Sequence, residues 1–220
     1  MNKVIYHGSK QIIKSPYYGG GKKNNDYGLG FYCTFEKDLA EEWSVSLKES
    51  GYCNKYEIDT SKLTILELDK YPSLVWLTIL IQNRIFSINN PMSAISKQYL
   101  IDNFSINYND YDVIYGYRAD DSYFDFAKSF LNNTISLSYL EDALKFGNLG
   151  YQFVLKSRKA FENITFIEAE KINPEKYYLR KVLREKIART LYVEGKLAEF
   201  NKNDIYIKDI IEKGLTINDF

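Results

Sequence analysis

The sequence predicts an α+β fold in which a β-sheet core carries helical insertions and a helical C-terminal extension. Three observations support this prediction. Strand-like and helix-like segments are mixed along the chain without strict alternation, which disfavours a doubly wound fold. No internal repeat and no Pro/Ser-rich linker divides the sequence. Hydrophobic residues make up 45% of the 220 positions, enough for the core of one domain, or of one domain with an appendage.

Strands are expected where short runs of apolar, aromatic and β-branched residues lie between turn-forming residues. A Gly-rich loop at 19–25 follows the first run, and the sequence Asp-Tyr-Gly-Leu-Gly at 26–30 leads into the second. In chain order, the expected strands are residues 4–6, 31–35, 52–58, 63–68, 112–117, 151–156 and 164–169.

Helices are expected where apolar residues recur every three or four positions. The first follows the second strand and places four apolar side chains on one face: Leu39, Ala40, Trp43 and Leu47. The next expected helices are residues 73–87, 92–104 and 122–131. A further helix begins with the capping-box spacing of Ser138 to Glu141, and Gly147 is the residue expected to end it.

The C-terminal part is also expected to be helical. A long amphipathic helix is predicted over residues 175–200, with four apolar residues at intervals of four forming its buried stripe: Leu179, Leu183, Ile187 and Leu191. A last helix is predicted over residues 205–213. These patterns divide the chain into a domain at 1–172 and a helical extension at 173–220 that packs on it.

Charge and residue counts argue against several classes of protein. Lys plus Arg total 29 and Asp plus Glu total 29, and a formal net charge of zero argues against a whole-protein electrostatic grip on nucleic acid or anionic lipid. One His and two Cys supply neither a disulfide framework nor, without carboxylates, a four-ligand zinc site, so no metal is expected. The N-terminus lacks the apolar core of a signal peptide, and the longest apolar run, residues 74–81, is too short to span a bilayer. We therefore expect a cytoplasmic protein with reduced cysteines and no membrane partner.

Two N-terminal segments carry the residues best suited to chemistry. In Tyr-His-Gly-Ser at 6–9, the only imidazole of the chain, His7, ends a strand before a glycine that lets a ligand approach the backbone. In Asp-Tyr-Gly-Leu-Gly-Phe-Tyr-Cys-Thr at 26–34, two glycines turn the chain and present Tyr32 on a short strand, where its ring could stack on a planar heterocycle. Each motif alone is weak, because a lone strand-end His is more often structural and most tyrosines in a chain with 20 of them serve packing.

Together these segments resemble the NAD-binding half of ADP-ribosyltransferases of the His–Tyr type, the branch that includes diphtheria toxin and the poly-ADP-ribose polymerases. The closer resemblance is to an uncharacterised bacterial family in that clan. Its members begin with a Tyr-His-Gly-Ser strand and continue through Asp-aromatic-Gly-x-Gly-Phe-Tyr-x-Thr into an Ala–Trp-containing helix, which here is residues 40–43. The segments at 117–121 and 150–157 are also similar to that family. The resemblance covers about residues 3–168 and implies an ADP-ribosyltransferase-like split β-sheet core.

The resemblance also implies a role for each matching residue. His7 would hydrogen-bond the adenine-side ribose of NAD, and Gly8 would hold the nicotinamide carboxamide through its backbone. Ser9 would add a second hydrogen-bonding group at that edge. Tyr32 would stack on the nicotinamide ring, with Tyr27 as a further aromatic wall. The implied activity is NAD-dependent mono-ADP-ribosylation of a macromolecular acceptor, protein or nucleic acid, with release of nicotinamide. A toxin or defence effector with a neutralising protein, or antitoxin, would suit the clan.

The third motif departs from the pattern of many transferases. Where these place a Glu near the start of a later strand, this chain has Gln152, which can hydrogen-bond a ribose but cannot act as a general base. Asp120 and Asp121 follow a strand directly and are the substitute carboxylates; favourable charge at a helix N-terminus explains them about equally well. Arg118 could pair with them or with a diphosphate, and Glu168 ranks below them.

Other interpretations stay open at this point. Because of Gln152, the domain could bind NAD or a partner protein without turnover. An RNA-cleaving toxin that uses His7 as acid and base would need no NAD. The loop with Lys22 and Lys23 is either a cover for the pyrophosphate or a solvated turn. Cys33 is more simply a packing thiol than a nucleophile. The basic residues between 180 and 189 are more simply a solvated helix face than a nucleic-acid site.

Overall fold

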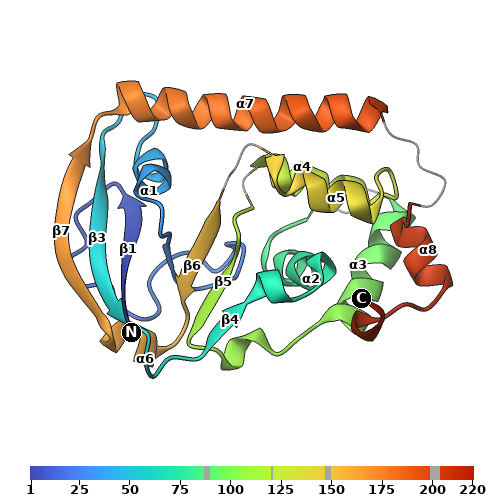
Figure 1. Ribbon diagram of the computed structural model, residues 1–220, viewed down its shortest axis with the longest axis horizontal. Helices are drawn as coiled ribbons and strands as arrows, with labels where there is room; N and C mark the ends of the chain where they lie inside the picture. Colours follow the sequence, from blue (N-terminus) through green and yellow to red (C-terminus); the bar gives the residue numbers. More distant parts are fainter. Residues whose placement is uncertain (87–89, 120, 147–149, 199–203) are drawn as a thin grey trace.

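The computed structural model describes residues 1–86, 90–119, 121–146, 150–198 and 204–220, and of residues 121, 122 and 196–198 the backbone alone. The fold is α+β, as predicted, and contains two sheets (Figure 1). The first sheet is antiparallel and has the order β1-β3-β7, with β1 at Asn2–Ser9, β3 at Gly51–Asp59 and β7 at Ile164–Ile172. The second has the order β2-β6-β5-β4, with β2 at Phe31–Cys33, β6 at Tyr151–Leu155, β5 at Val113–Tyr117 and β4 at Ile65–Glu67.

A single isolated bridge joins strand β1 to the end of β2. Tyr6 and Thr34 exchange backbone hydrogen bonds of 2.8 and 2.9 Å, and the pairing does not extend to their neighbours. Beside this bridge the two sheets share an apolar layer that includes the buried side chains of Ile5, Tyr56 and Phe153. The backbones of the two sheets are therefore joined at Tyr6, and among the described residues the backbone of β1 past Tyr6 has no strand partner on the β2 side.

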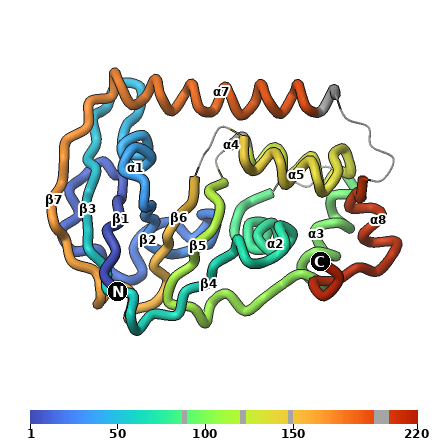
Figure 2. The backbone as a smooth tube through the Cα atoms, viewed as in Figure 1, coloured from blue at the N-terminus to red at the C-terminus, as the bar shows by residue number. Residues whose placement is uncertain are grey.

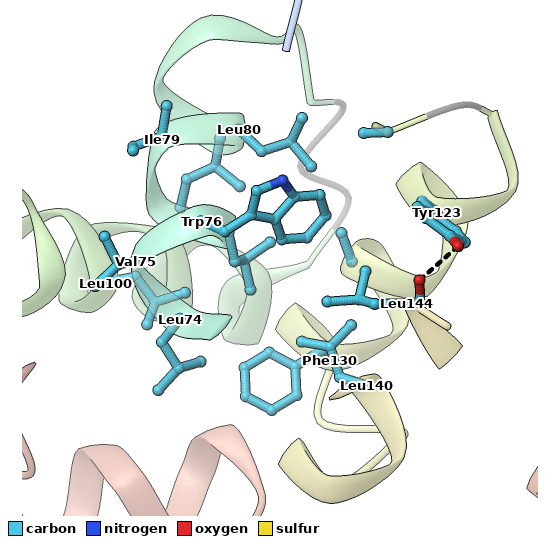
Figure 3. Packing of buried hydrophobic residues seen from close by; sticks show 14 of the residues in the cluster. Leu74, Val75, Trp76, Ile79, Leu80, Leu100, Tyr123, Phe130, Leu140 and Leu144 are labelled. Atoms are coloured by element: carbon cyan, nitrogen blue, oxygen red, sulfur yellow. Dashed lines mark hydrogen bonds between the residues drawn. The ribbon is translucent and has the colours of Figure 1, made fainter. Parts of the chain in front are cut away.

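A helical layer covers the second sheet and has the most apolar helix of the chain at its centre. Helix α2, Ser73–Asn83, is buried from Leu74 to Ile81, and α3 (Pro91–Phe104), α4 (Asp121–Leu131), α5 (Leu137–Ala143) and α8 (Ile207–Glu212) belong to the same layer (Figure 1). Figure 3 shows Trp76 of α2 surrounded by side chains of this layer, among them Leu80, Phe130 and Leu144. Its indole nitrogen donates a 3.2 Å hydrogen bond to the carbonyl of Tyr117, which ties the helical layer to the end of β5.

Helix α7, Pro174–Ala198, packs the opposite way from the prediction. It runs along one side of the molecule above α1, α4 and α5 (Figures 1 and 2). The expected buried stripe is exposed: Leu179, Leu183, Ile187 and Leu191 are 67, 57, 44 and 40% accessible. The face towards the domain carries three ion pairs, Arg184–Glu42, Arg180–Asp38 and Arg189–Asp125, together with the buried Ala188 and with Tyr192, which stacks on Phe126. Sequence periodicity located the apolar stripe but not the face that turns inward, where ion pairs and aromatic contacts both hold the helix.

The structure also differs from the predicted elements at the ends of two helices and by one additional short helix. Helix α1, Lys37–Ser44, ends before Leu47, which is 64% exposed and not on its buried face. Helix α5 is capped by Ser136, whose hydroxyl accepts from the amide of Tyr139, and not by Ser138. A short helix α6, Arg158–Glu162, was not expected. Gly147 lies outside the described residues. Among the helices of the described ranges, none has both the length and the hydropathy needed to cross a bilayer.

Candidate functional site

A cavity of about 700 Å³ lies where β1, β2, β6 and helix α1 meet. Its size falls within the range of small-molecule sites in proteins. Four of the residues singled out in the sequence line it, although they come from distant parts of the chain: His7, Gly8, Tyr32 and Gln152. The fold therefore brings the three sequence motifs to one place.

His7 has a defined tautomer. Its Nδ1 lies 2.7 Å from the carbonyl oxygen of Tyr32, and its ring lies against Phe31 with 4.3 Å between ring centroids. A carbonyl oxygen only accepts hydrogen bonds, so Nδ1 carries the proton and Nε2 has the free lone pair. Burial lowers the pKa of His7, against a smaller opposite effect of the hydrogen bond to Tyr32. At neutral pH the side chain is thus a neutral imidazole with an acceptor nitrogen.

Gly8 meets two separate demands. Backbone groups of alternate residues in a strand point to the same side, so the amide and carbonyl of Gly8 point like those of Tyr6, away from β3 and towards the gap beside β2. A Cβ atom at this position would lie 2.0 Å from the carbonyl oxygen of Ala40. Glycine is required for the close approach of helix α1, and the exposed backbone edge is available to a ligand.

The ring of Tyr32 is held by the loop that precedes its strand. Its hydroxyl donates to the carbonyl of Gly28 at 2.6 Å and accepts from the amide of Tyr27 at 3.1 Å. The ammonium of Lys156 in turn donates to the carbonyls of Tyr27 and Leu29. Burial raises the pKa of Tyr32, which keeps the hydroxyl protonated as a donor. Tyr32 therefore presents a ring fixed at its far end to the cavity.

Gln152 carries an unpaired acceptor. The side chain is 7% exposed and lies on β6 opposite Gly116. Its side chain acts to lower the pKa of Asp26, and its Oε1 has no hydrogen-bond partner among the described residues. A buried acceptor without a partner costs about 1–3 kcal/mol.

Two further cavity residues, Asp26 and Arg84, were not assigned a role from the sequence. Asp26 is 4% exposed; it accepts a 3.0 Å bond from the amide of Ala119 and lies 3.3 Å from Nη1 of Arg84. A signal for Asp26 existed, since it opens the Asp-Tyr-Gly-Leu-Gly segment. Arg84 directly follows helix α2 and gave no such signal.

Trp43 and Lys22 also line the cavity. The indole nitrogen of Trp43 is buried and lacks a hydrogen-bond partner among the described residues, like Oε1 of Gln152. The guanidinium of Arg118 lies 5.1 Å from the Trp43 ring, in a cation–π arrangement. A donor and an acceptor without partners therefore belong to the same cavity wall.

Ser9 and Tyr27 lie elsewhere than the resemblance implied. The hydroxyl of Ser9 donates to the carbonyl of Gln11 at 2.6 Å and accepts from Asn54, so it fastens the loop after β1. Tyr27 is fully buried; its hydroxyl donates to the carbonyl of Tyr117 and accepts from the indole of Trp76. Its aromatic ring serves the core of the helical layer and forms no wall of the cavity.

The other candidates give a mixed result. Asp120 and the side chain of Asp121 lie outside the described part of the chain. Glu168 points away from the site on the outer strand β7, where it pairs with Lys55 at 2.9 Å. Cys33 is fully buried, and burial raises the pKa of its thiol well above the usual value, which confirms the packing role. In the described ranges, no group of three or more His, Cys, Asp or Glu side chains could hold a metal ion.

A family model described as "Protein of unknown function (DUF3990)" matches residues 3–166. The chain belongs to this family. The DUF3990 match includes every cavity residue named above and ends within β7, before helices α7 and α8. No curated protein and no solved structure matches the sequence significantly.

The DUF3990 cavity offers a specific set of chemical groups. His7 provides a neutral acceptor nitrogen, Gly8 a free backbone edge, and Tyr32 a fixed aromatic ring. Gln152 adds an unpaired oxygen and Asp26 a carboxylate. These groups suit a ligand that combines a planar ring, an amide and hydroxyl groups.

Proposed function

We propose that this protein is an NAD-dependent mono-ADP-ribosyltransferase of the His–Tyr type, which modifies a macromolecular acceptor and releases nicotinamide. In this proposal the two sheets correspond to an ADP-ribosyltransferase-like split β-sheet core. The observation that carries it is the meeting of His7, Gly8, Tyr32 and Gln152 in one cavity of about 700 Å³.

The cavity groups fit the parts of NAD. The backbone amide and carbonyl of Gly8 match the carbonyl and amino group of the nicotinamide carboxamide, one donor and one acceptor on each side. Nε2 of His7 is an acceptor for a ribose hydroxyl, and Gln152 lines the same cavity as a further polar side chain. Lys22 brings a positive charge to the rim for the pyrophosphate.

The chain's residues would act on the bond between nicotinamide and ribose in defined ways. Gly8 and Tyr32 fix the nicotinamide ring, so that the bond can lengthen without rotation of the leaving group. Positive charge then develops on the ribose, and the carboxylate of Asp26, a residue of the cavity wall, would stabilise it. Tyr32 would stack less strongly on the departing neutral nicotinamide than on the cationic ring of NAD.

The test follows adenylate-labelled NAD with the purified protein in a bacterial extract. The variants are His7→Ala, Tyr32→Leu and Gln152→Ala. Gln98→Ala serves as the matched control, because Gln98 is exposed on α3 and its amide hydrogen-bonds Asp102. Nicotinamide release, label in acid-precipitable material and its sensitivity to protease or nuclease are measured, together with NAD affinity by calorimetry. We expect label transfer by the parent and Gln98→Ala, and at least a tenfold loss in the other three.

The competing outcomes are distinct. NAD binding by the parent without release of nicotinamide would make the domain a silent NAD-binding module. Neither binding nor release, from protein with a cooperative thermal transition, would reject the proposed function. RNA cleavage without NAD that is lost in His7→Ala but kept in Tyr32→Leu would identify a nuclease instead.

A further inference from the structure

Asp26 occupies a special position in the cavity wall. Its carboxylate accepts from the amide of Ala119 at 3.0 Å and lies 3.3 Å from Nη1 of Arg84, and Gln152 lines the same cavity. The side chain is 4% exposed, and the surface it shows lines the cavity. The carboxylate is therefore held in one orientation beside the residue that stands where many transferases have a glutamate.

A second buried aspartate in the same protein shows what is different about Asp26. Asp112, at 8% exposure, accepts from the amide and hydroxyl of Thr64, from Ser157 and from Lys159. Burial acts to raise its pKa, but these hydrogen bonds outweigh burial and lower it. Asp112 is thus a structural carboxylate with its acceptor sites filled.

For Asp26 the balance is reversed. Burial raises its pKa to about 6, although the Ala119 amide, the two arginines at 84 and 118, and Gln152 all act to lower it. The charge of Asp26 in turn acts to raise the pKa of Tyr27 and of Tyr32. A carboxylate of this kind is ionised at neutral pH and is a stronger proton acceptor than an ordinary aspartate.

We propose that Asp26 is the general base that receives the proton of the acceptor nucleophile. This inference rests on the proposed function. In the step, the acceptor X–H attacks the anomeric carbon of the nicotinamide ribose and the X–C bond forms. The bond from that carbon to the nicotinamide nitrogen breaks, its electron pair returns to the ring, and neutral nicotinamide leaves. The proton of X–H passes to the carboxylate of Asp26.

The geometry divides two tasks between neighbouring side chains. Gln152 and Asp26 both line the cavity, and Gln152 acts to lower the pKa of the carboxylate. An amide cannot take up a proton, whereas the carboxylate next to it can. Gln152 is then the group that positions the ribose, and Asp26 the group that accepts the proton.

The experiment measures nicotinamide release at saturating NAD, with bacterial extract as the source of acceptor, from pH 5 to 8. The variants are Asp26→Asn, Asp26→Glu and, as the matched control, Asp112→Asn. For the parent and Asp112→Asn we expect a rate that rises with pH, with a midpoint near the pKa of about 6. For Asp26→Asn we expect a 10²–10⁴-fold lower rate without that rise, and an NAD dissociation constant within about threefold of the parent.

The outcomes separate the role of Asp26 from the proposed transferase function. An Asp26→Asn rate within threefold of the parent, or a persistent pH dependence, would overturn the role of Asp26 while leaving the transferase intact. If Asp26→Asn does not fold, Asp26→Glu decides: a retained rise with pH supports the base, and its loss overturns it. If the parent releases no nicotinamide at any pH, the proposed function fails and the role of Asp26 falls with it.

Discussion

The Nδ1 of His7 and the carbonyl oxygen of Tyr32 are 2.7 Å apart, so a side chain of β1 is fixed to the backbone of β2 next to the only backbone bridge between these strands in the described structure. The same hydrogen bond decides which imidazole nitrogen carries the proton. The orientation of one residue of the proposed NAD site is thus set by another. His7 and Tyr32 are coupled structurally even before any ligand joins them.

The tautomer of His7 can be tested directly, because the protein has a single histidine. In a long-range ¹H–¹⁵N spectrum we expect one imidazole with a protonated Nδ1 and an unprotonated Nε2 at pH 7. Because burial lowers the pKa of His7, its titration midpoint should lie below 6.5, and urea should restore it to that value. A midpoint above 6.5 in the folded protein would contradict the described packing.

Gly8→Ala should destabilise the protein strongly. The new Cβ would lie 2.0 Å from the backbone of α1, which cannot move aside as a flexible side chain can. We expect a loss of at least about 3 kcal/mol in the free energy of unfolding measured with urea. Gly20→Ala is the control, since its Cβ would meet only the exposed ring of Tyr17, and its cost should stay below about 1 kcal/mol.

Asp26→Asn should make the protein more stable at pH 8. The folded-state pKa of Asp26 is raised from 3.8 to about 6, so its contribution to stability is complete below pH 4 and is lost as the pH rises through 6. Removing the charge should therefore add roughly 2–3 kcal/mol above pH 7 and almost nothing at pH 4. Thermal unfolding of both proteins across this range measures the difference. If the difference in stability between Asp26→Asn and the parent is the same at pH 4 and pH 8, burial does not raise the pKa of Asp26.

Lys156→Met should loosen the loop that holds Tyr32. The Lys156 ammonium donates to the carbonyls of Tyr27 and Leu29, and methionine fills the space without donating. We expect amide hydrogen exchange in residues 26–30 to become at least tenfold faster, and NAD binding to weaken with it. Lys145→Met is the control, because Lys145 is exposed and contacts Asp142 far from the loop. Unchanged amide hydrogen exchange at residues 26–30 in Lys156→Met would show that Lys156 does not hold this loop.

The anchoring of α7 should depend on one ion pair more than on another. Arg184→Met leaves the carboxylate of Glu42, whose side chain is 1% exposed, without this partner, and should cost about 3–5 kcal/mol. Arg180→Met breaks an exposed pair with Asp38 and should cost at most about 1 kcal/mol. Urea unfolding of both variants gives the comparison. Similar costs would mean that another contact holds the helix.

Much of the fold could be predicted from local patterns. The strands at β3 and β6 and the helices α2, α3 and α4 fall within a few residues of the expected ranges, because their apolar residues face a packed interior. Helix α7 shows the limit of the method. An amphipathic pattern identifies a helix but not the surface it meets, and the face that turns inward carries both Arg184, which pairs with the buried Glu42, and Tyr192, which stacks on Phe126.

From the sequence, the candidate site was predictable only for residues that their type and local motif single out. His7, Gly8, Tyr32 and Gln152 stand out by type and context, and the fold brings them together. Tyr27 stood out in the same way, yet its ring is in the core, because a motif does not tell which of two aromatic residues faces outward. The properties of Asp26 depend on groups at positions 84, 118 and 152, and no local pattern contains them.

Strand β2 has only three residues, and within the described structure its ladder partner is β6, with Phe31 opposite Leu155 and Cys33 opposite Phe153. During synthesis, His7 and Tyr32 therefore leave the ribosome long before β6, the strand that pairs with β2 and carries Gln152. The ribosome delivers most of the domain before this cavity can close. Because of this strand order, any activity of the site can begin only when synthesis of the domain is nearly complete.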